Sequence, residues 1–259
     1  SFRIVGSISW LYWSDRLMEF PLGVFGIALG TVILPRLSAQ HAEASPERFN
    51  ATLDWALRLA LVIIAPATLG LIALASPLLA TLFGYGEFGA ADVEAANWSL
   101  MAYGIGLFGF VLVKVLVPGY FSRQDTRGPV RCAVIAMGVN MVLSLSLVAL
   151  LIGTGIAHAG LALATGLAAW VNAALLLRGL RRQGIYQPLP GWGRLSRRVL
   201  AALLAMAFSL QAAAGEPALC LAVDAPLRIA WLAGVIVLGG GVYGLVLLLL
   251  RGRPGECRG

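Results

Sequence analysis

Residues 226–250 read PLRIAWLAGVIVLGGGVYGLVLLLL and contain one charged side chain, that of Arg228. About 20 apolar residues in a helix span the hydrocarbon core of a bilayer, so this segment is predicted to cross a membrane. Further apolar stretches precede it at 5–35, 52–82, 96–118, 131–152, 157–177 and 199–214. The sequence therefore predicts an all-α, polytopic integral membrane protein, a helical bundle of about seven transmembrane helices.

The overall composition agrees with this prediction and excludes other classes of protein. Of the 259 residues, 59% are apolar and 12% are charged, and the mean hydropathy is +0.87. Soluble domains carry about 25% charged residues, so these values exclude a soluble enzyme and a disordered chain. The apolar stretches are also too continuous for the alternating strands of an outer-membrane barrel, which are about 10 residues long.

Basic residues gather in every second link between the apolar stretches. The links 83–95, 153–156 and 215–225 contain no Lys or Arg, although they carry the acidic residues Glu87, Asp92, Glu94, Glu216 and Asp224. The remaining links and the tail hold Arg36, Arg48, Arg123, Arg127, Arg131, Arg178, Arg181, Arg182, Arg194, Arg197, Arg198, Arg251, Arg253 and Arg258. Because short cytoplasmic loops are rich in Lys and Arg, the Ser1 end is predicted to lie on the outer side of the membrane and the carboxy-terminus in the cytoplasm. This placement explains the net charge of +7 without a nucleic-acid partner.

The first apolar stretch contains three ionisable residues, in the sequence Ser14-Asp15-Arg16-Leu17-Met18-Glu19-Phe20-Pro21. Each charge costs at least ~2.5–3.5 kcal/mol at the centre of a membrane helix, so we expect a positive reason for keeping them. On an α-helix, one stripe about 100° wide holds Tyr12, Asp15, Arg16, Glu19, Gly23, Gly26 and Gly30.

This charged stripe permits three hypotheses. It is an ion-pair cluster that joins helices, a polar cavity in which Arg16 binds an anionic substrate, or a proton or ion relay through Asp15 and Glu19. Arginine suits a phosphate because its planar fork donates two parallel hydrogen bonds.

Other polar residues in the apolar stretches have simpler explanations. Asp54 and Arg58 have the i, i+4 spacing of a local ion pair, and Lys114 is near enough to a helix end for its amine to reach the membrane surface. Asn140 and Asn172 are expected to form interhelical hydrogen bonds. No residue pattern suggests a catalytic site, a cofactor or a metal, so a membrane enzyme is not expected.

Several motifs together resemble the lipid II flippase family, also known as MurJ or MviN. They are DRLMEFP at 15–21 with the following run to Pro35, Lys114-Val115-Leu116 with Pro118-Gly119, Ser122-Arg123-Gln124-Asp125 with Pro129-Val130, Gly166-Leu167-Ala168-Ala169 with Asn172, and Pro188-x-Pro190-Gly191-Trp192. The family has fourteen membrane helices, and this chain resembles the eighth to the fourteenth.

The resemblance implies transport of an undecaprenyl-pyrophosphate-linked cell-wall precursor from the inner to the outer leaflet of the bacterial inner membrane, by alternating access. It implies substrate binding by Arg16 with Asp15 and Glu19, with Lys114, Arg123 and Asn172 as secondary polar sites. It also implies two partners, membrane lipids and an amino-terminal lobe that this chain lacks. The Na⁺ site of some relatives has acidic ligands without evident counterparts here, so no metal is expected.

The resemblance further implies that the chain has three parts. Residues 1–182 form a carboxy-terminal transport lobe, and residues 183–198 form a cytoplasmic Pro/Gly/Arg linker. Residues 199–259 contain two helices that form a groove for the lipid tail, followed by a cytoplasmic tail. Two alternatives remain at this point. One is a related exporter of another lipid-linked oligosaccharide or a drug, against which the DRLMEF and SRQD motifs argue. The other is a structural membrane subunit, which would not require the charged stripe.

Overall fold

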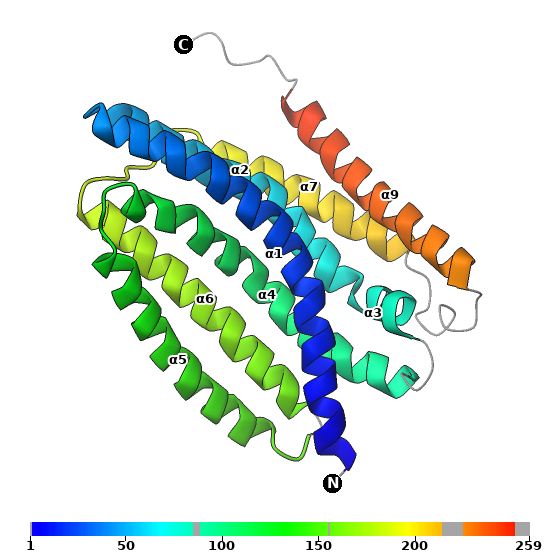
Figure 1. Cartoon of the computed structure of the whole chain (residues 1–259). Helices are drawn as coiled ribbons and strands as arrows, with labels where there is room; N and C mark the ends of the chain where they lie inside the picture. Colours follow the sequence, from blue (N-terminus) through cyan, green and yellow to red (C-terminus); the bar gives the residue numbers. More distant parts are fainter. Residues whose placement is uncertain (1, 85–88, 155, 214–224, 252–259) are drawn as a thin grey trace.

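The computed structural model describes residues 2–84, 89–154, 156–213 and 225–251, apart from the side chains of 2–8, 25, 27–29, 90 and 251. All regular structure in these ranges is helical, which confirms the predicted all-α class (Figure 1). The helices are α1 (Phe2–Ala42), α2 (Pro46–Ala73), α3 (Ala75–Phe83), α4 (Ala90–Phe121), α5 (Arg127–Leu151), α6 (Ala157–Arg182), α7 (Trp192–Ala213) and α9 (Ala225–Arg251).

Helix α4 is the centre of the larger unit and contacts α1, α2, α3 and α6. Small residues let α4 approach α6 closely, as in other membrane helix pairs. Gly106 faces Gly166, and a Cβ on Gly109 would lie only 2.9 Å from the backbone nitrogen of Trp170. Helix α5 packs on the far side of α6 and leaves most of its surface exposed, as expected of a lipid-facing helix.

Six of the described helices are long and apolar enough to cross a membrane, namely α2, α4, α5, α6, α7 and α9. The predicted count of seven is close, and α1, which carries the charged stripe, accounts for the difference. Helix α1 runs without a break through Pro21 and Pro35.

The predicted single stretch 52–82 is two helices. The chain leaves α2 at Leu74 and re-enters helix in α3, with Pro77 in the first turn of α3, where its missing N–H leaves no hydrogen bond unmade. Pro77 therefore marks a helix start, whereas Pro66 lies inside the continuous α2.

Helices α7 and α9 form a smaller unit that packs on α2 and α3, away from α5 (Figure 1). Two hydrogen bonds from α9 fix this unit to the larger one. The Tyr243 hydroxyl donates to the Val62 carbonyl at 2.7 Å, and Arg228 Nη1 donates to the Ala80 carbonyl at 2.8 Å. A separate apolar cluster fills the junction and comprises Leu74, Ala202, Met206, Leu210, Leu232, Val235 and Tyr243.

The linker between the two units is shorter than the predicted 183–198, because α7 begins at Trp192. Gly184 and Gly191 have φ values of 69° and 103°, a region that is open to glycine and disfavoured for other residues. These two glycines turn the chain out of α6 and into α7, so the arginines at 194, 197 and 198 belong to the first turns of a helix.

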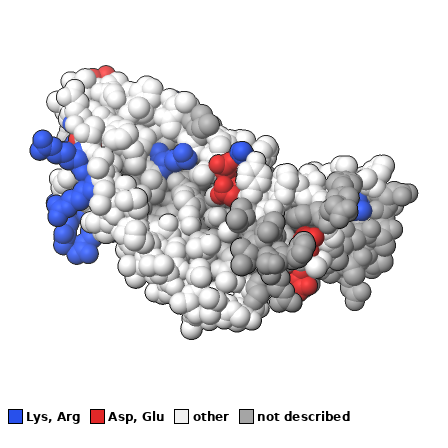
Figure 2. Space-filling view, turned by 60° about the horizontal axis from the view of Figure 1, so that its bottom comes forward, with Lys and Arg blue, Asp and Glu red and all other residues white. Residues whose placement is uncertain are grey.

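Charge is distributed unevenly along the bundle. Figure 2 shows basic side chains gathered at one end of a face and a separate mixed group of acidic and basic side chains near its middle. The links α1–α2, α4–α5 and α6–α7 meet at one end, where they line a common pocket. Five charged residues on which the predicted orientation also rests lie outside the described residues, namely Glu87, Glu216, Asp224, Arg253 and Arg258.

Candidate functional site

The charged stripe of α1 forms a compact polar group on one exposed helix face. Arg16 Nη1 donates to Glu19 Oε2 at 3.0 Å, with the two side chains 57% and 51% exposed. Arg16 Nε also donates to the Tyr12 hydroxyl at 3.4 Å, and its guanidinium lies 5.3 Å from the centroid of the Tyr12 ring. Asp15, beside them, is half-buried.

These contacts all lie within one helix. In the ranges that the structure describes, the Arg16–Glu19 pair therefore ties no second helix to α1, and an ion pair this exposed contributes little to stability. The geometry gives no support to the hypothesis of a helix-joining cluster. It instead leaves the Arg16 fork accessible from outside the bundle.

Arg16 also lines a large groove that is otherwise apolar. The groove has a volume of about 870 Å³ and lies between α1, α2, α3, α7 and α9. Its lining thus combines a permanent cation with a long hydrocarbon-like surface. The lining residues are Arg16, Leu17, Phe20, Pro21, Val24, Pro66, Ala67, Gly70, Leu71, Leu74, Leu78, Leu82, Phe83, Met206, Leu210, Ile236 and Gly240.

Contacts with α4 and α6 hold this part of α1 in place. Trp10 Nε1 donates to Asp92 Oδ1 at 2.8 Å, and the Trp10 ring lies 5.1 Å from that of His158. One turn later the buried Ser14 hydroxyl bonds to the Ala96 carbonyl at 3.0 Å. These residues position Arg16, and sequence reasoning missed them because their partners are 82 residues away.

Lys114 and Asn172, two of the predicted secondary sites, lie together in a different cavity. It has a volume of about 380 Å³ and is lined by residues of α1, α4, α5 and α6. Among the described residues, the Asn172 Oδ1 atom is buried without a hydrogen-bond partner, and Asn140 pairs with Ser144 of its own helix at 3.4 Å. The expected interhelical hydrogen bonds of Asn140 and Asn172 are not formed in this part of the chain.

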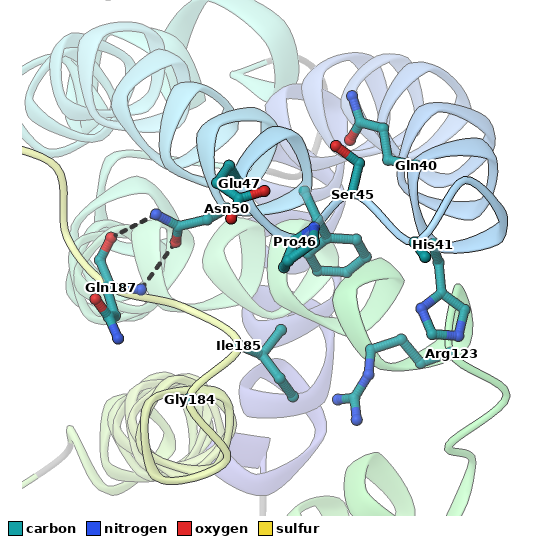
Figure 3. A pocket seen from close by; sticks show the side chains of 12 residues that line it. Gln40, His41, Ser45, Pro46, Glu47, Asn50, Arg123, Gly184, Ile185 and Gln187 are labelled. Carbon is teal, nitrogen blue, oxygen red and sulfur yellow. Dashed lines mark hydrogen bonds between the residues drawn. The ribbon is translucent and has the colours of Figure 1, made fainter.

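Arg123, the third predicted secondary site, lies apart from both. It lines a pocket of about 530 Å³ where the α1–α2, α4–α5 and α6–α7 links meet (Figure 3). Its Nη1 donates to Gln183 Oε1 at 3.0 Å. Beside it, Asn50 and Gln187 exchange two hydrogen bonds of 3.0 and 2.8 Å (Figure 3). The structure therefore does not bring Arg123 to Arg16.

A buried carboxylate fixes the linker to α2. Asp54, predicted only as the local partner of Arg58, accepts from Arg58 Nε at 2.6 Å. It also accepts from the Tyr186 hydroxyl at 2.9 Å, the Leu189 N–H at 3.2 Å and Trp192 Nε1 at 2.7 Å. Burial, with the hydrogen bond to Asp54, raises the pKa of the Tyr186 hydroxyl above its usual value. We call Asp54 and its four donors the linker clamp. It fixes the position of the first residue of α7 relative to α2.

The described residues contain no group of three or more His, Cys, Asp or Glu side chains placed to hold a metal ion. What the arrangement provides is an exposed guanidinium beside an apolar groove, with two smaller cavities elsewhere that contain polar side chains. Such an arrangement can accommodate an amphiphile with an anionic head.

Comparison with known proteins gives one family. A sequence model of the family described as "Lipid II flippase MurJ" matches residues 1–216. The "Probable lipid II flippase MurJ" of Vibrio cholerae is 47% identical over 260 residues, which is 98% of this chain and 47% of that protein. The protein of the same description from Haemophilus influenzae is 41% identical over 98% of this chain and 50% of its own length.

A solved structure shares the fold. It is described as "Lipid II flippase MurJ, inward closed conformation" and matches with a TM-score of 0.76 at 23% sequence identity, over 95% of this chain and 47% of that one. The chain thus spans about half the length of the relatives that it matches. By the family model and the extent of these matches, it is a multi-pass membrane protein that belongs to the lipid II flippase MurJ family.

Proposed function

We propose that this chain provides the carboxy-terminal half of a lipid II flippase, in which Arg16 binds the pyrophosphate of the cargo and the apolar groove holds its polyprenyl tail. The cargo would be an undecaprenyl-pyrophosphate-linked cell-wall precursor, moved from the inner to the outer leaflet of the bacterial inner membrane. Asp15 and Glu19 are positioning residues that hold and screen the guanidinium.

The single observation that carries this proposal is the place of Arg16 in the lining of the groove. An apolar groove alone would suit any lipid, and an exposed cation alone would suit any anion. A groove that has both suits a ligand with an anionic head and a long hydrocarbon tail. Burying hydrocarbon gains about 0.8 kcal/mol per CH₂ group, while the guanidinium fork matches phosphate oxygens.

The proposed mechanism is alternating access, without the making or breaking of any bond. Two lobes would move against each other around a central site, with residues 1–182 as one lobe and an amino-terminal lobe as the other. Arg16 faces out of this bundle, so in the complete protein it would face the second lobe. The units α1–α6 and α7–α9 remain joined by the linker clamp, and the segment at 199–259 supplies the lipid-tail side of the groove.

A chimera tests the proposal. Residues 1–259 would replace the matching region of the Vibrio cholerae relative, and precursor in the outer leaflet would be measured after the host's own flippase is depleted. The chimera should restore flipping. Arg16→Lys should slow it at least about tenfold although the charge is kept, because hydrogen bonds to charged groups contribute about 1.5–3 kcal/mol, and Arg16→Ala should slow it further.

The control is Arg48→Ala, which removes an exposed arginine paired with Glu43 at 3.6 Å, away from the groove. This variant should flip normally, and all variants should reach the membrane in equal amounts. Normal flipping by Arg16→Ala at an equal protein level would show that Arg16 does not bind the cargo.

A further inference from the structure

Lys114 places a cation at a largely apolar cavity that the proposed pyrophosphate site does not use. The cavity of about 380 Å³ lies between α1, α4, α5 and α6. Within the described ranges, Lys114 makes no hydrogen bond or ion pair. The Lys114 side chain is exposed, so its amine is open to an anion that comes from outside the chain.

Gly26 brings this cation to the charged stripe of α1. A Cβ at Gly26 would lie 2.5 Å from Lys114 Cδ and 3.2 Å from Cε, so the lysine stem crosses the α1 backbone where a side chain is missing. The buried Gly26 is on the same stripe as Arg16 and ten residues after it. At 1.5 Å of rise per residue, Arg16 and Gly26 are about 15 Å apart along the helix axis.

The other polar groups of the cavity indicate what kind of anion fits. The Asn172 Oδ1 atom is buried and accepts no hydrogen bond from any described residue. Asn140 accepts from Ser144 through its own carbonyl oxygen, which leaves its amide nitrogen as a donor. A ligand that satisfies this set has an anionic oxygen for Lys114 and an N–H for Asn172. A peptide with a free carboxylate has both.

We propose that the cavity around Lys114 and Asn172 is a second subsite, which binds a carboxylate and a neighbouring N–H in the peptide part of the cargo. This inference rests on the proposed function, and it requires that the headgroup of the cargo carry a peptide. Arg16 would bind any polyprenyl pyrophosphate, whereas Lys114 distinguishes those that carry a carboxylated headgroup. Lys114 would therefore be a specificity-determining residue.

Binding measurements with three probes test this subsite on the purified chimera in phosphatidylcholine nanodiscs. The probes are undecaprenyl pyrophosphate, the complete peptide-bearing precursor, and the same precursor with its peptide carboxylates amidated. Lys114→Gln should weaken binding of the complete precursor about tenfold and leave undecaprenyl pyrophosphate unchanged. The amidated precursor should bind the wild type and Lys114→Gln equally. Arg16→Ala should weaken binding of all three probes.

Gly26→Ala provides a variant that keeps the lysine charge. The added methyl group would displace the flexible end of Lys114, so this variant should reproduce the selective loss. Its control is Gly138→Ala on α5, because a Cβ there meets no atom within 4 Å and Gly138 does not line the cavity. This control should bind all probes normally.

Four results would overturn the subsite. Unchanged binding of the complete precursor to Lys114→Gln is the simplest. Equal weakening of undecaprenyl pyrophosphate would assign Lys114 to the pyrophosphate site. A Lys114 effect that appears only when phosphatidylglycerol is added would assign the cavity to a lipid headgroup. If the wild type binds none of the probes, the proposed function fails together with the subsite, whereas failure of the subsite alone leaves undecaprenyl pyrophosphate binding intact.

Discussion

Glu19 and Asp54 are both carboxylates, but they contribute differently to the fold because one is exposed and the other is buried. Glu19 is half exposed and pairs with Arg16 on its own helix, so its effect is local. The Asp54 side chain is only 2% exposed and accepts hydrogen bonds from a side chain of α2, from the linker backbone and from the first residue of α7. A buried carboxylate with several donors stabilises a fold only while every donor keeps its acceptor.

Asp54→Ala should therefore lower the free energy of unfolding by about 3 kcal/mol, because it leaves the Arg58 charge and three further donors without their partner. Chemical denaturation of the purified chain in detergent measures this change. Glu43→Ala is the matched control, since Glu43 belongs to an exposed ion pair of 3.6 Å. It should cost less than about 1 kcal/mol. Equal losses for the two variants would mean that the linker clamp does not stabilise the fold.

The spacing of residues along the sequence predicted only part of the linker clamp and only part of the surroundings of the charged stripe. The i, i+4 spacing of Asp54 and Arg58 predicted their pair, which the structure shows at 2.6 Å. Nothing near Asp54 in sequence pointed to Tyr186, Leu189 and Trp192, which are more than 130 residues away. Likewise, helical phase placed Arg16, Glu19 and Gly26 on one stripe, but only the packing of α4 on α1 shows that Lys114 crosses this stripe.

At the scale of the helices, the lengths of the apolar stretches predicted well which segments form membrane helices, and they predicted the ends of these helices less well. A stretch of apolar residues shows where a helix can cross a membrane, and six described helices meet that criterion. It does not show where the backbone changes direction. The break at Leu74 and the start of α7 at Trp192 depend on Pro77, on glycines with positive φ, and on hydrogen bonds across the bundle.

Helix α5 offers a direct test of the predicted orientation. Its 25 residues have a length of about 37 Å, enough to reach both surfaces. Arg127, its first residue, is exposed, and Thr154 is exposed in the link that follows its last residue, Leu151. The cation bias predicts Arg127 on the cytoplasmic side and Thr154 on the periplasmic side. An impermeant thiol reagent added to intact cells should therefore label Thr154→Cys and not Arg127→Cys.

Opening the cells should make Arg127→Cys reactive, which controls for accessibility of the introduced thiol. Labelling of Arg127→Cys in intact cells, with Thr154→Cys protected, would reverse the orientation. It would also place the basic ends of α6 and α7 outside the cell.

At the scale of the whole molecule, the function that we propose depends on how two units meet. The larger unit presents Arg16 and most of the apolar lining of the groove, and α7 and α9 complete it with Met206, Leu210, Ile236 and Gly240. The hydrogen bonds of Tyr243 and Arg228 and the linker clamp hold these units together. The groove therefore exists only in the assembled chain, which is why no single motif in the sequence revealed its shape.

The most direct test of the central claim is to map the tail of one bound ligand and to ask whether its position depends on Arg16. The probe is undecaprenyl pyrophosphate with a photoreactive group in its tail, bound to the chimera in nanodiscs, and the cross-linked residues would be identified by mass spectrometry. The account predicts cross-links to groove residues such as Met206, Leu210 and Ile236, and their loss in Arg16→Ala. Cross-links of equal yield on exposed α5 residues such as Met137 and Met141, unaffected by Arg16→Ala, would contradict it.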